Sequence, residues 1–226
     1  MSDGEVPNQG GVPNDGGVDG VLAFLRAAEG LKTHVRSAHT SDGRPESVAA
    51  HTWRVCLMAL VLRDRLPGVD LGRLLAMCVV HDLGEALGGD VPAPEQARRL
   101  AADPGAGKAD AERADLLRLV APLPAGAAGE IVALWDEYEA AASPEARAAK
   151  ALDKLETLLQ HVQGANPPGF DYRFNLGYGR RYTEAPAVVA ALRARLDGET
   201  EARAEGGGAN GVRRTGSGER EGAGRG

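Results

Sequence analysis

The stretch Cys78-Val79-Val80-His81-Asp82-Leu83-Gly84-Glu85-Ala86-Leu87-Gly88-Gly89-Asp90 carries the densest group of ionisable side chains next to an apolar run. A His-Asp doublet is followed by Glu85 and then by Asp90, while Leu74–Val80 before it is entirely apolar and should be buried. Burying these groups is costly unless they pair or bind a cation. Imidazole and carboxylate together suit a divalent first-row metal. A His-Asp doublet beside Gly84 can also simply cap the end of a helix.

The apolar run before the doublet fits either a buried helix or a buried parallel strand, because periodicity does not separate the two in a short segment. Its Leu, Ala and Met residues favour a helix. No other segment of the chain has a convincing strand pattern that could pair with it. We therefore predict a helix over Leu71–Asp82, with His81, Asp82, Glu85 and Asp90 at its end and in the following turn.

A second important helix is predicted upstream, where Pro45-Glu46-Ser47 opens a segment that runs to Leu62. Proline suits a first helical turn and serine suits a cap. One stripe of this helix carries His51 together with core residues, namely Val48, Val55, Met58 and Leu62. Its other faces are apolar too, through Trp53, Leu57, Leu60 and Val61, which predicts a central, buried helix. A single His on such a face is often only a hydrogen-bonded core residue.

The remaining segments predict an all-helical chain. Further helices are expected over Val21–Leu31, Ala109–Val120, Ala127–Ala142, Ser143–Gln163 and Ala185–Leu196. Polar or Gly/Pro-rich stretches predict loops over Lys32–Arg44 and Gly164–Tyr182, and a short helix or loop over Pro92–Ala102. Asp153 lies near the edge of the apolar stripe of its helix, beside Lys154 and Glu156. Taken alone, Asp153 reads as a solvated acid.

Composition predicts one all-α domain with disordered ends. The chain has 226 residues, of which 43% are hydrophobic and only 4% aromatic, so one aliphatic core is expected. The Gly-rich segments 1–20 and 198–226 are expected to be disordered tails around a domain over residues 21–197.

Charge and cysteine content limit the functions and the cellular locations that are expected for this chain. A net charge of −6 argues against a protein that binds nucleic-acid polymers or a membrane surface. No apolar stretch approaches the roughly 18 residues of a membrane span, and residues 1–20 lack the features of a signal peptide. Cys56 and Cys78 form neither a zinc motif nor a disulfide framework and are expected to be buried free thiols. The expected location is the cytoplasm.

His51, the His81-Asp82 doublet and Asp153 follow the order H…HD…D, which resembles the HD-domain metal-dependent phosphohydrolases. The resemblance is strongest to the 5′-deoxynucleotidases of that superfamily. It rests on PESVAAH over Pro45–His51, on HDLGEALGGD over His81–Asp90, and on the ALDKLE stretch around Asp153. It implies an HD-domain helical bundle and hydrolysis of (deoxy)nucleoside 5′-monophosphates to nucleoside and phosphate. It covers roughly Val21 to Leu196.

The resemblance also implies roles for particular residues. His51, His81, Asp82 and Asp153 are the implied ligands of one divalent metal ion, with Mn, Co, Fe, Ni or Mg as candidates. Arg36 matches a phosphate-binding arginine in the loop before the first ligand. Asp90 matches an acid that contacts the sugar hydroxyl or assists the leaving group. Glu85 follows His81 by one helical turn, so it should face the same pocket and act as a general base, although it could instead only pair with a cation.

Some departures bear on the expected chemistry. No His lies between Asp82 and Asp153, where binuclear members have extra ligands, so one metal and hydrolysis are predicted. Ser37-Ala38-His39 replaces a tryptophan that the family often has after the loop arginine, which leaves open the choice between deoxyribose and ribose. Near the motifs only Arg36, Arg44 and Arg54 are found. This favours a monophosphate over the substrates of a triphospho- or pyrophosphohydrolase, the main enzymatic alternative. A non-catalytic nucleotide- or metal-binding helical protein is the other alternative.

A homodimer is also predicted. The resemblance implies it, and the loop Gly164–Tyr182 is richer in aromatic residues than a free loop should be. Aromatic residues are enriched at protein interfaces.

Overall fold

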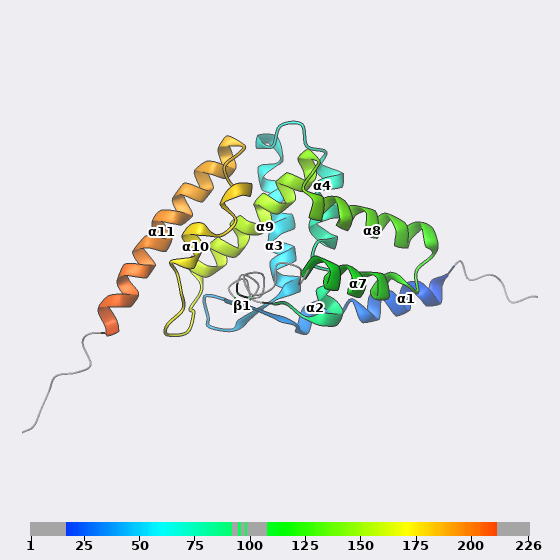
Figure 1. Ribbon diagram of the computed structural model, residues 1–226, viewed down its shortest axis with the longest axis horizontal. Helices are drawn as coiled ribbons and strands as arrows, with labels where there is room; N and C mark the ends of the chain where they lie inside the picture. Colours follow the sequence, from blue (N-terminus) through cyan, green and yellow to red (C-terminus); the bar gives the residue numbers. More distant parts are fainter. Residues whose placement is uncertain (1–16, 92–94, 96–97, 99–107, 212–226) are drawn as a thin grey trace, which may run out of the picture.

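The computed structural model describes residues 17–91, 95, 98 and 108–211. Regular structure in this range is helical apart from one short hairpin, so the predicted all-α class is confirmed. Figure 1 shows α9 crossing the middle of the molecule, with α11 along one flank and α8, α7 and α1 on the other. The elements are α1 (Val18–Ala27), α2 (Gly30–Thr33), β1 (Val35–His39), β2 (Pro45–Ser47), α3 (Val48–Leu62), η1 (Arg63–Arg65), α4 (Leu71–Val80), α5 (Glu85–Gly88), α7 (Lys108–Val120), α8 (Ala125–Ala140), α9 (Pro144–Gln163), α10 (Phe174–Gly177), η2 (Arg180–Tyr182) and α11 (Ala187–Gly211).

Helix α9 is the central element, because α3, α4, α8 and α11 all pack against it. It begins where the sequence predicts, since Ser143 caps it by accepting a hydrogen bond from the backbone N–H of Ala146 at 3.0 Å. Its fully buried leucines are Leu152, Leu155 and Leu158. Several polar residues of α9 are buried as well, so the aliphatic core surrounds a helix that also carries chemistry.

Helices α3 and α4 pack against each other and against α9. Ser47 caps α3 through the N–H of Ala50 at 3.2 Å, and Asp70 caps α4 through the N–H of Arg73 at 2.7 Å. The helical state predicted for the apolar run is confirmed. Helix α4 ends at Val80, so the His-Asp doublet follows its last turn.

The prediction that α3 is buried on all sides is wrong. Only the face that carries Val48, His51, Val55 and Ala59 is buried. On the opposite side, Trp53 is 65% exposed and Val61 is 71% exposed, and the remaining exposed apolar side chains of that face are Leu57 and Leu60. Helices α4 and α9 cover one side of α3, so apolar residues on its outer side form an exposed stripe.

The loop predicted over Lys32–Arg44 is a β-hairpin instead. Strands β1 and β2 pair antiparallel, with Val35 opposite Ser47 and His39 opposite Pro45. The turn between them is the predicted Asp-Gly turn, where Gly43 has a φ of 85°. Pro45 therefore belongs to a strand and not to the first turn of α3. The sequence did not predict this hairpin, because its strands are polar and lack the alternation of apolar residues that marks a strand. Their pairing depends on backbone hydrogen bonds.

The single helix predicted over Val21–Leu31 is two helices, α1 and α2. A side chain at Gly30, the first residue of α2, would meet the backbone oxygen of Ala86 at 2.2 Å. Glycine thus permits α2 to approach α5 directly, and the chain breaks its helix just before this contact.

The last helix extends well beyond Leu196, where the sequence predicts its end. Thr200 is fully buried, and the guanidinium of Arg203 donates to the carbonyl oxygens of Val162 at 2.9 Å and Gly164 at 3.3 Å. The segment that follows Gly198 is therefore not disordered through Gly211. Its Gly-rich composition predicted disorder, but Thr200 is buried and Arg203 binds the end of α9.

One buried side chain makes several of the hydrogen bonds that hold the long loop between α9 and α11. Arg193 of α11 donates to the carbonyl oxygens of Tyr178 at 2.7 Å, Asn175 at 3.0 Å and Leu176 at 2.9 Å. Its remaining nitrogen pairs with Asp197 at 2.7 Å. Buried carbonyl groups need such partners, so Arg193 fixes this loop more directly than the aromatic packing that the sequence suggested.

Two predictions lie mostly outside the described residues. They are the short helix or loop over Pro92–Ala102 and the outer parts of both tails, residues 1–16 and 212–226. The domain limits 21–197 stay a prediction. No helix in the described ranges combines the length and apolar character that crossing a membrane requires.

Two consecutive leucines of α7 test the core. Leu116 is fully buried, whereas Leu117 is 43% exposed. We expect Leu116→Ala to lower the free energy of unfolding by about 2–5 kcal/mol, because it leaves a cavity. Leu117→Ala, the matched control on the same helix, should cost less than about 1 kcal/mol. Urea denaturation followed by circular dichroism measures both. Equal losses would contradict the packing of α7 described here.

Candidate active site

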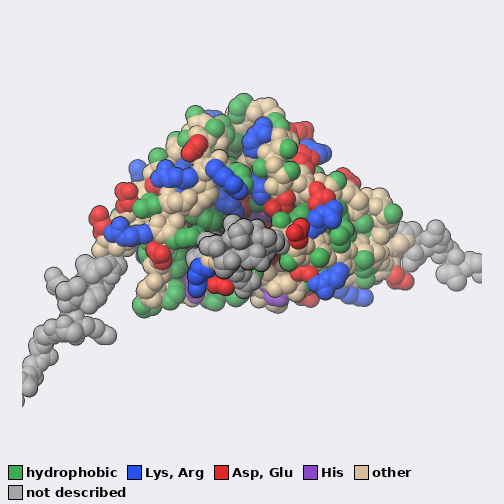
Figure 2. All heavy atoms as spheres, in the orientation of Figure 1, with side chains coloured by type: hydrophobic (Ala, Val, Ile, Leu, Met, Phe, Trp, Pro, Cys, Tyr) green, Lys and Arg blue, Asp and Glu red, His purple; other side chains and the backbone are tan. Residues whose placement is uncertain are grey.

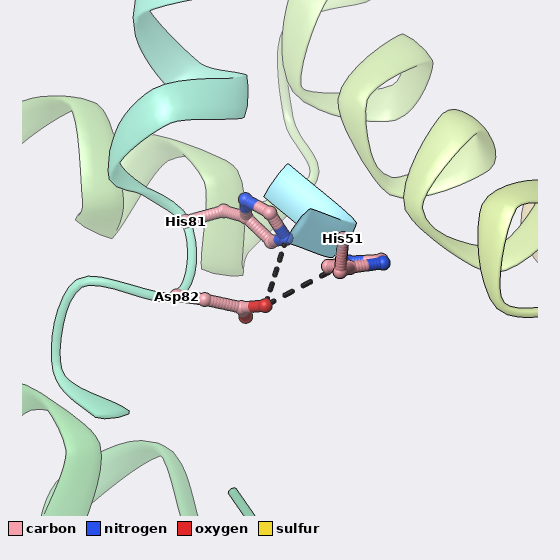
Figure 3. A group of neighbouring side chains, drawn as sticks. All are labelled: His51, His81 and Asp82. Atoms are coloured by element: carbon pink, nitrogen blue, oxygen red, sulfur yellow. Dashed lines mark ion pairs between the residues drawn. The ribbon is translucent and has the colours of Figure 1, made fainter. Parts of the chain in front are cut away.

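His51, His81 and Asp82 point toward one another from α3 and from the turn after α4 (Figure 3). Oδ2 of Asp82 lies 3.1 Å from Nε2 of His81 and 3.7 Å from Nε2 of His51. Both imidazoles are buried. The structure therefore brings the doublet together with the distant His that the sequence motif pairs with it.

The other ring nitrogen of each imidazole is already engaged. His81 Nδ1 lies 2.8 Å from the carbonyl oxygen of Cys78, which can only accept a hydrogen bond, so Nδ1 carries the proton. His51 Nδ1 contacts the buried carboxylate of Glu156. The Nε2 atoms of both rings are buried and have no hydrogen-bond geometry to any described residue. Imidazoles whose Nδ1 is held by a carboxylate or a carbonyl, and whose Nε2 lies beside further donor atoms, match the pattern of metal ligands.

Asp153 joins this group from α9. It is buried, so the alternative of a solvated acid is wrong. Its Oδ1 lies 3.3 Å from Nε2 of His51. Its Oδ2 accepts hydrogen bonds from Tyr138 at 2.8 Å and from Lys154 at 2.7 Å. These two donors occupy the outer oxygen and leave the inner one directed at the imidazole.

The neighbouring charges keep both carboxylates ionised. Burial opposes the charged form of Asp82, but His81, His51 and Arg36 outweigh it and hold the pKa of Asp82 below its usual value. Burial also opposes the charge of Asp153, but Lys154 and His51 hold its pKa well below the usual value. Burial and Arg36 lower the pKa of His51, while Glu156 and Asp153 outweigh them and raise it to about 9. A cation that binds here would displace the proton of His51.

These side chains fit a divalent cation. Donor atoms of His51, His81 and Asp82 lie within 4.8 Å of one another, and Asp153 adds a second carboxylate. Two neutral imidazoles and two ionised carboxylates carry two negative charges, which a divalent ion neutralises. Mixed nitrogen and oxygen ligation without a thiolate suits first-row metals such as Mn, Co, Fe and Ni.

A cavity of about 370 Å³ opens beside this group. Its wall includes Arg36, Glu85 and Asp90, all of which the sequence selects as site residues, together with Asp82 and Asp153. Glu85 is buried at the start of α5 and Asp90 is half-buried. Figure 2 shows Lys and Arg side chains and Asp and Glu side chains around the centre of this face.

Arg36 is held by partners from different elements. From β1 it donates to Oδ2 of Asp82 at 3.4 Å and to Oγ1 of Thr157 at 3.0 Å, and its Nε lies 3.8 Å from Glu46. Burial opposes its charge, but Asp82 and Asp90 outweigh burial and raise the pKa of Arg36. Arg36 is thus a fixed, permanently charged donor beside the candidate metal ligands.

Sequence reasoning missed several residues of the cavity, and two of the three arginines that it noted near the motifs do not line the cavity. Arg44 pairs with Asp42 at 2.8 Å on the surface, and Arg54 binds Glu156 behind His51; neither lines the cavity. The cations that line it with Arg36 are Lys150, Lys154 and Arg181. Aromatic residues of the wall are Tyr138, Tyr178 and Tyr182. Of these residues, only Lys154 could have been identified from the sequence, because it lies next to Asp153. The other side chains reach the cavity through tertiary packing.

Comparison with known proteins identifies the family of the chain. A family model described as the HD domain matches residues 28–193. The chain is 32% identical over 145 residues to the 5′-deoxynucleotidase HDDC2 of Danio rerio, covering 63% of this chain and 68% of that protein. It is 33% identical over 149 residues to the 5′-deoxynucleotidase HDDC2 of Mus musculus, covering 62% and 68%. It is also similar to the crystal structure of a predicted metal-dependent phosphohydrolase from Magnetospirillum magnetotacticum MS-1. There the TM-score is 0.72 at 29% identity, covering 85% of this chain and 96% of that one.

Proposed function

Because the chain belongs to the HD-domain family, we propose that it is a metal-dependent 5′-nucleotidase that hydrolyses deoxynucleoside 5′-monophosphates to nucleoside and phosphate. One observation carries this proposal. The buried Nε2 atoms of His51 and His81 converge with two ionised carboxylates at a cavity that also contains a fixed arginine. Such a site can hold a metal and a phosphate together.

In this proposal His51, His81, Asp82 and Asp153 hold one divalent metal, with Mn, Co, Fe, Ni or Mg as candidates. The bound ion supplies Lewis-acid polarisation of the phosphoryl oxygen and lowers the pKa of water. The protein contributes the orientation of the ligands. Tyr138 and Lys154 keep Asp153 turned toward His51.

Arg36 binds the phosphate in this proposal. Its guanidinium lines the cavity and already contacts the ligand Asp82. A planar guanidinium forms paired charge-assisted hydrogen bonds to phosphate oxygens. Its second partner, Thr157, fixes the plane of that guanidinium before substrate enters.

Glu85 serves as the general base, and Asp90 serves the leaving nucleoside oxygen or the sugar hydroxyl. Both carboxylates line the cavity while the proposed ligand set is complete without them. Burial of Glu85 in the first turn of α5 limits its movement, as a group that orients water requires.

The nucleoside is proposed to lie against the wall that Tyr178, Arg181 and Tyr182 form. Each of three cavity cations already faces a carboxylate, since Arg36 pairs with Asp82, Lys150 pairs with Glu139 at 2.8 Å and Lys154 pairs with Asp153. Few charges are therefore left for further phosphates, which supports a monophosphate over a triphosphate.

Phosphate release tests the function directly. We expect the purified protein with Mn²⁺ or Co²⁺ to release phosphate from deoxynucleoside 5′-monophosphates, and a chelator to abolish the release. Deoxynucleoside triphosphates, the substrates of the alternative enzyme, should give neither phosphate nor pyrophosphate at a comparable rate. Absence of phosphate release from every monophosphate with every candidate metal would refute the proposal.

Substitutions at Asp153 and Glu85 distinguish a metal ligand from a general base. Asp153→Ala should remove the bound metal, measured by metal analysis after gel filtration. Glu85→Gln should retain the metal and lower kcat by about 10²–10⁴-fold, the usual contribution of a general base. If Glu85→Gln hydrolysed deoxynucleoside monophosphates at the wild-type rate, the base would have to be Asp90.

Arg36→Ala provides the contrast for these two variants. It should keep the metal and chiefly raise KM, because the phosphate loses a charged hydrogen-bond donor. For the first of these variants, Asp153→Ala, full metal occupancy would exclude Asp153 from the set of metal ligands.

We propose that the protein is a homodimer through the outer face of α3. This face exposes Trp53 and Val61 over more than half of their surface, and such apolar stripes commonly mark interfaces. Light scattering at micromolar concentration should give the mass of a dimer, and Trp53→Glu should give a monomer. Leu117→Glu, at another exposed leucine, is the control and should stay dimeric. A monomer mass for the unaltered protein would contradict the proposal.

A further inference from the structure

A buried carboxylate lies directly behind His51. Glu156 has no exposed surface, and its Oε2 contacts Nδ1 of His51, the ring nitrogen that faces away from the cavity. Glu156 follows Asp153 by three residues on α9, so both carboxylates face α3. His51 thus contacts Asp153 with Nε2 and Glu156 with Nδ1.

Arg54 keeps Glu156 ionised. Its guanidinium binds Oε1 of Glu156 through Nε at 2.7 Å and through Nη2 at 2.6 Å, and it also contacts Gln160. An ionised carboxylate can only accept a hydrogen bond, so Nδ1 of His51 must donate.

This arrangement has a consequence for the other ring nitrogen. When Nδ1 carries a proton that is bound to a carboxylate, Nε2 of the neutral ring is left as the lone pair, and the plane of the ring is fixed. A carboxylate behind a ligand imidazole also raises its basicity. Glu156, with Arg54 behind it, occupies that position, while His81 has only the neutral carbonyl of Cys78. The two imidazoles are therefore not equivalent.

We infer that Glu156 is a positioning residue that makes His51 the stronger of the two imidazole ligands. Glu156 does not line the cavity, so it acts through His51 and not on substrate. This inference rests on the proposed metal site. It gives a role to the last residue of the ALDKLE stretch, to which the sequence analysis assigns none and which does not line the cavity.

Affinity for Co²⁺ tests this inference. In E156Q the side chain keeps its size and one acceptor but loses the charge. We expect the dissociation constant for Co²⁺, measured by competition with a chromophoric chelator, to rise about 10–100-fold. The visible spectrum of bound Co²⁺ should also change, because the orientation of His51 is no longer fixed. A purely structural role would lower the thermal stability of the metal-free protein without changing either quantity.

E145Q is the matched control. Glu145 is another buried glutamate of α9, but its partner is the backbone N–H of Asp70 at 2.8 Å and not a proposed ligand. E145Q should keep wild-type Co²⁺ affinity and spectrum, whatever it does to melting temperature. Wild-type affinity and spectrum in E156Q would overturn the role of Glu156 and leave the metal site standing. Failure of the unaltered protein to bind Co²⁺ would overturn the metal site and the inference together.

Discussion

The packing of α9 against α3 is the constraint on which the site depends, because it places one imidazole between two buried carboxylates. Asp153 and Glu156 reach His51 from the same face of α9, one at each ring nitrogen. Neither carboxylate could stay ionised in an aliphatic core alone. The ring that separates them is consequently fixed on both sides, and its inner nitrogen faces the cavity.

Charged partners on the outer side explain why the core accepts this cluster. Arg54 binds Glu156, Lys154 binds Asp153, and Arg36 binds Asp82. Arg54 and Lys154 occupy oxygens that point away from the two Nε2 atoms, whereas Arg36 contacts Oδ2 of Asp82, the oxygen that faces those atoms. Removing one member of such a buried pair leaves an uncompensated charge. The same contacts that make burial possible therefore turn the remaining donor atoms toward one point, so stability and ligand geometry have a common cause.

The parts of this fold that could be predicted from the sequence are those with a local physical cause. Helices α3 and α9 follow from apolar spacing and from the serines Ser47 and Ser143 at their starts, and α4 follows from its Leu, Ala and Met content. The motif residues come together because these helices pack. Arg181 and Tyr178 could not be predicted as wall residues, because tertiary hydrogen bonds such as that from Arg193 to the carbonyl oxygen of Tyr178 hold their segment in place. The continuation of α11 likewise depends on two tertiary contacts within a Gly-rich sequence.

The hairpin shows how such a tertiary arrangement serves the chemistry. Ser47 ends β2 and also caps α3, so the strand pair and the helix that carries His51 share one residue. Strand β1 pairs with β2, which places Arg36 3.4 Å from Asp82. A proposed anion-binding side chain on a free loop would have to be ordered by substrate at an entropic cost. Here backbone pairing has ordered it in advance, so the phosphate contact and the candidate metal ligands belong to a single unit of the fold.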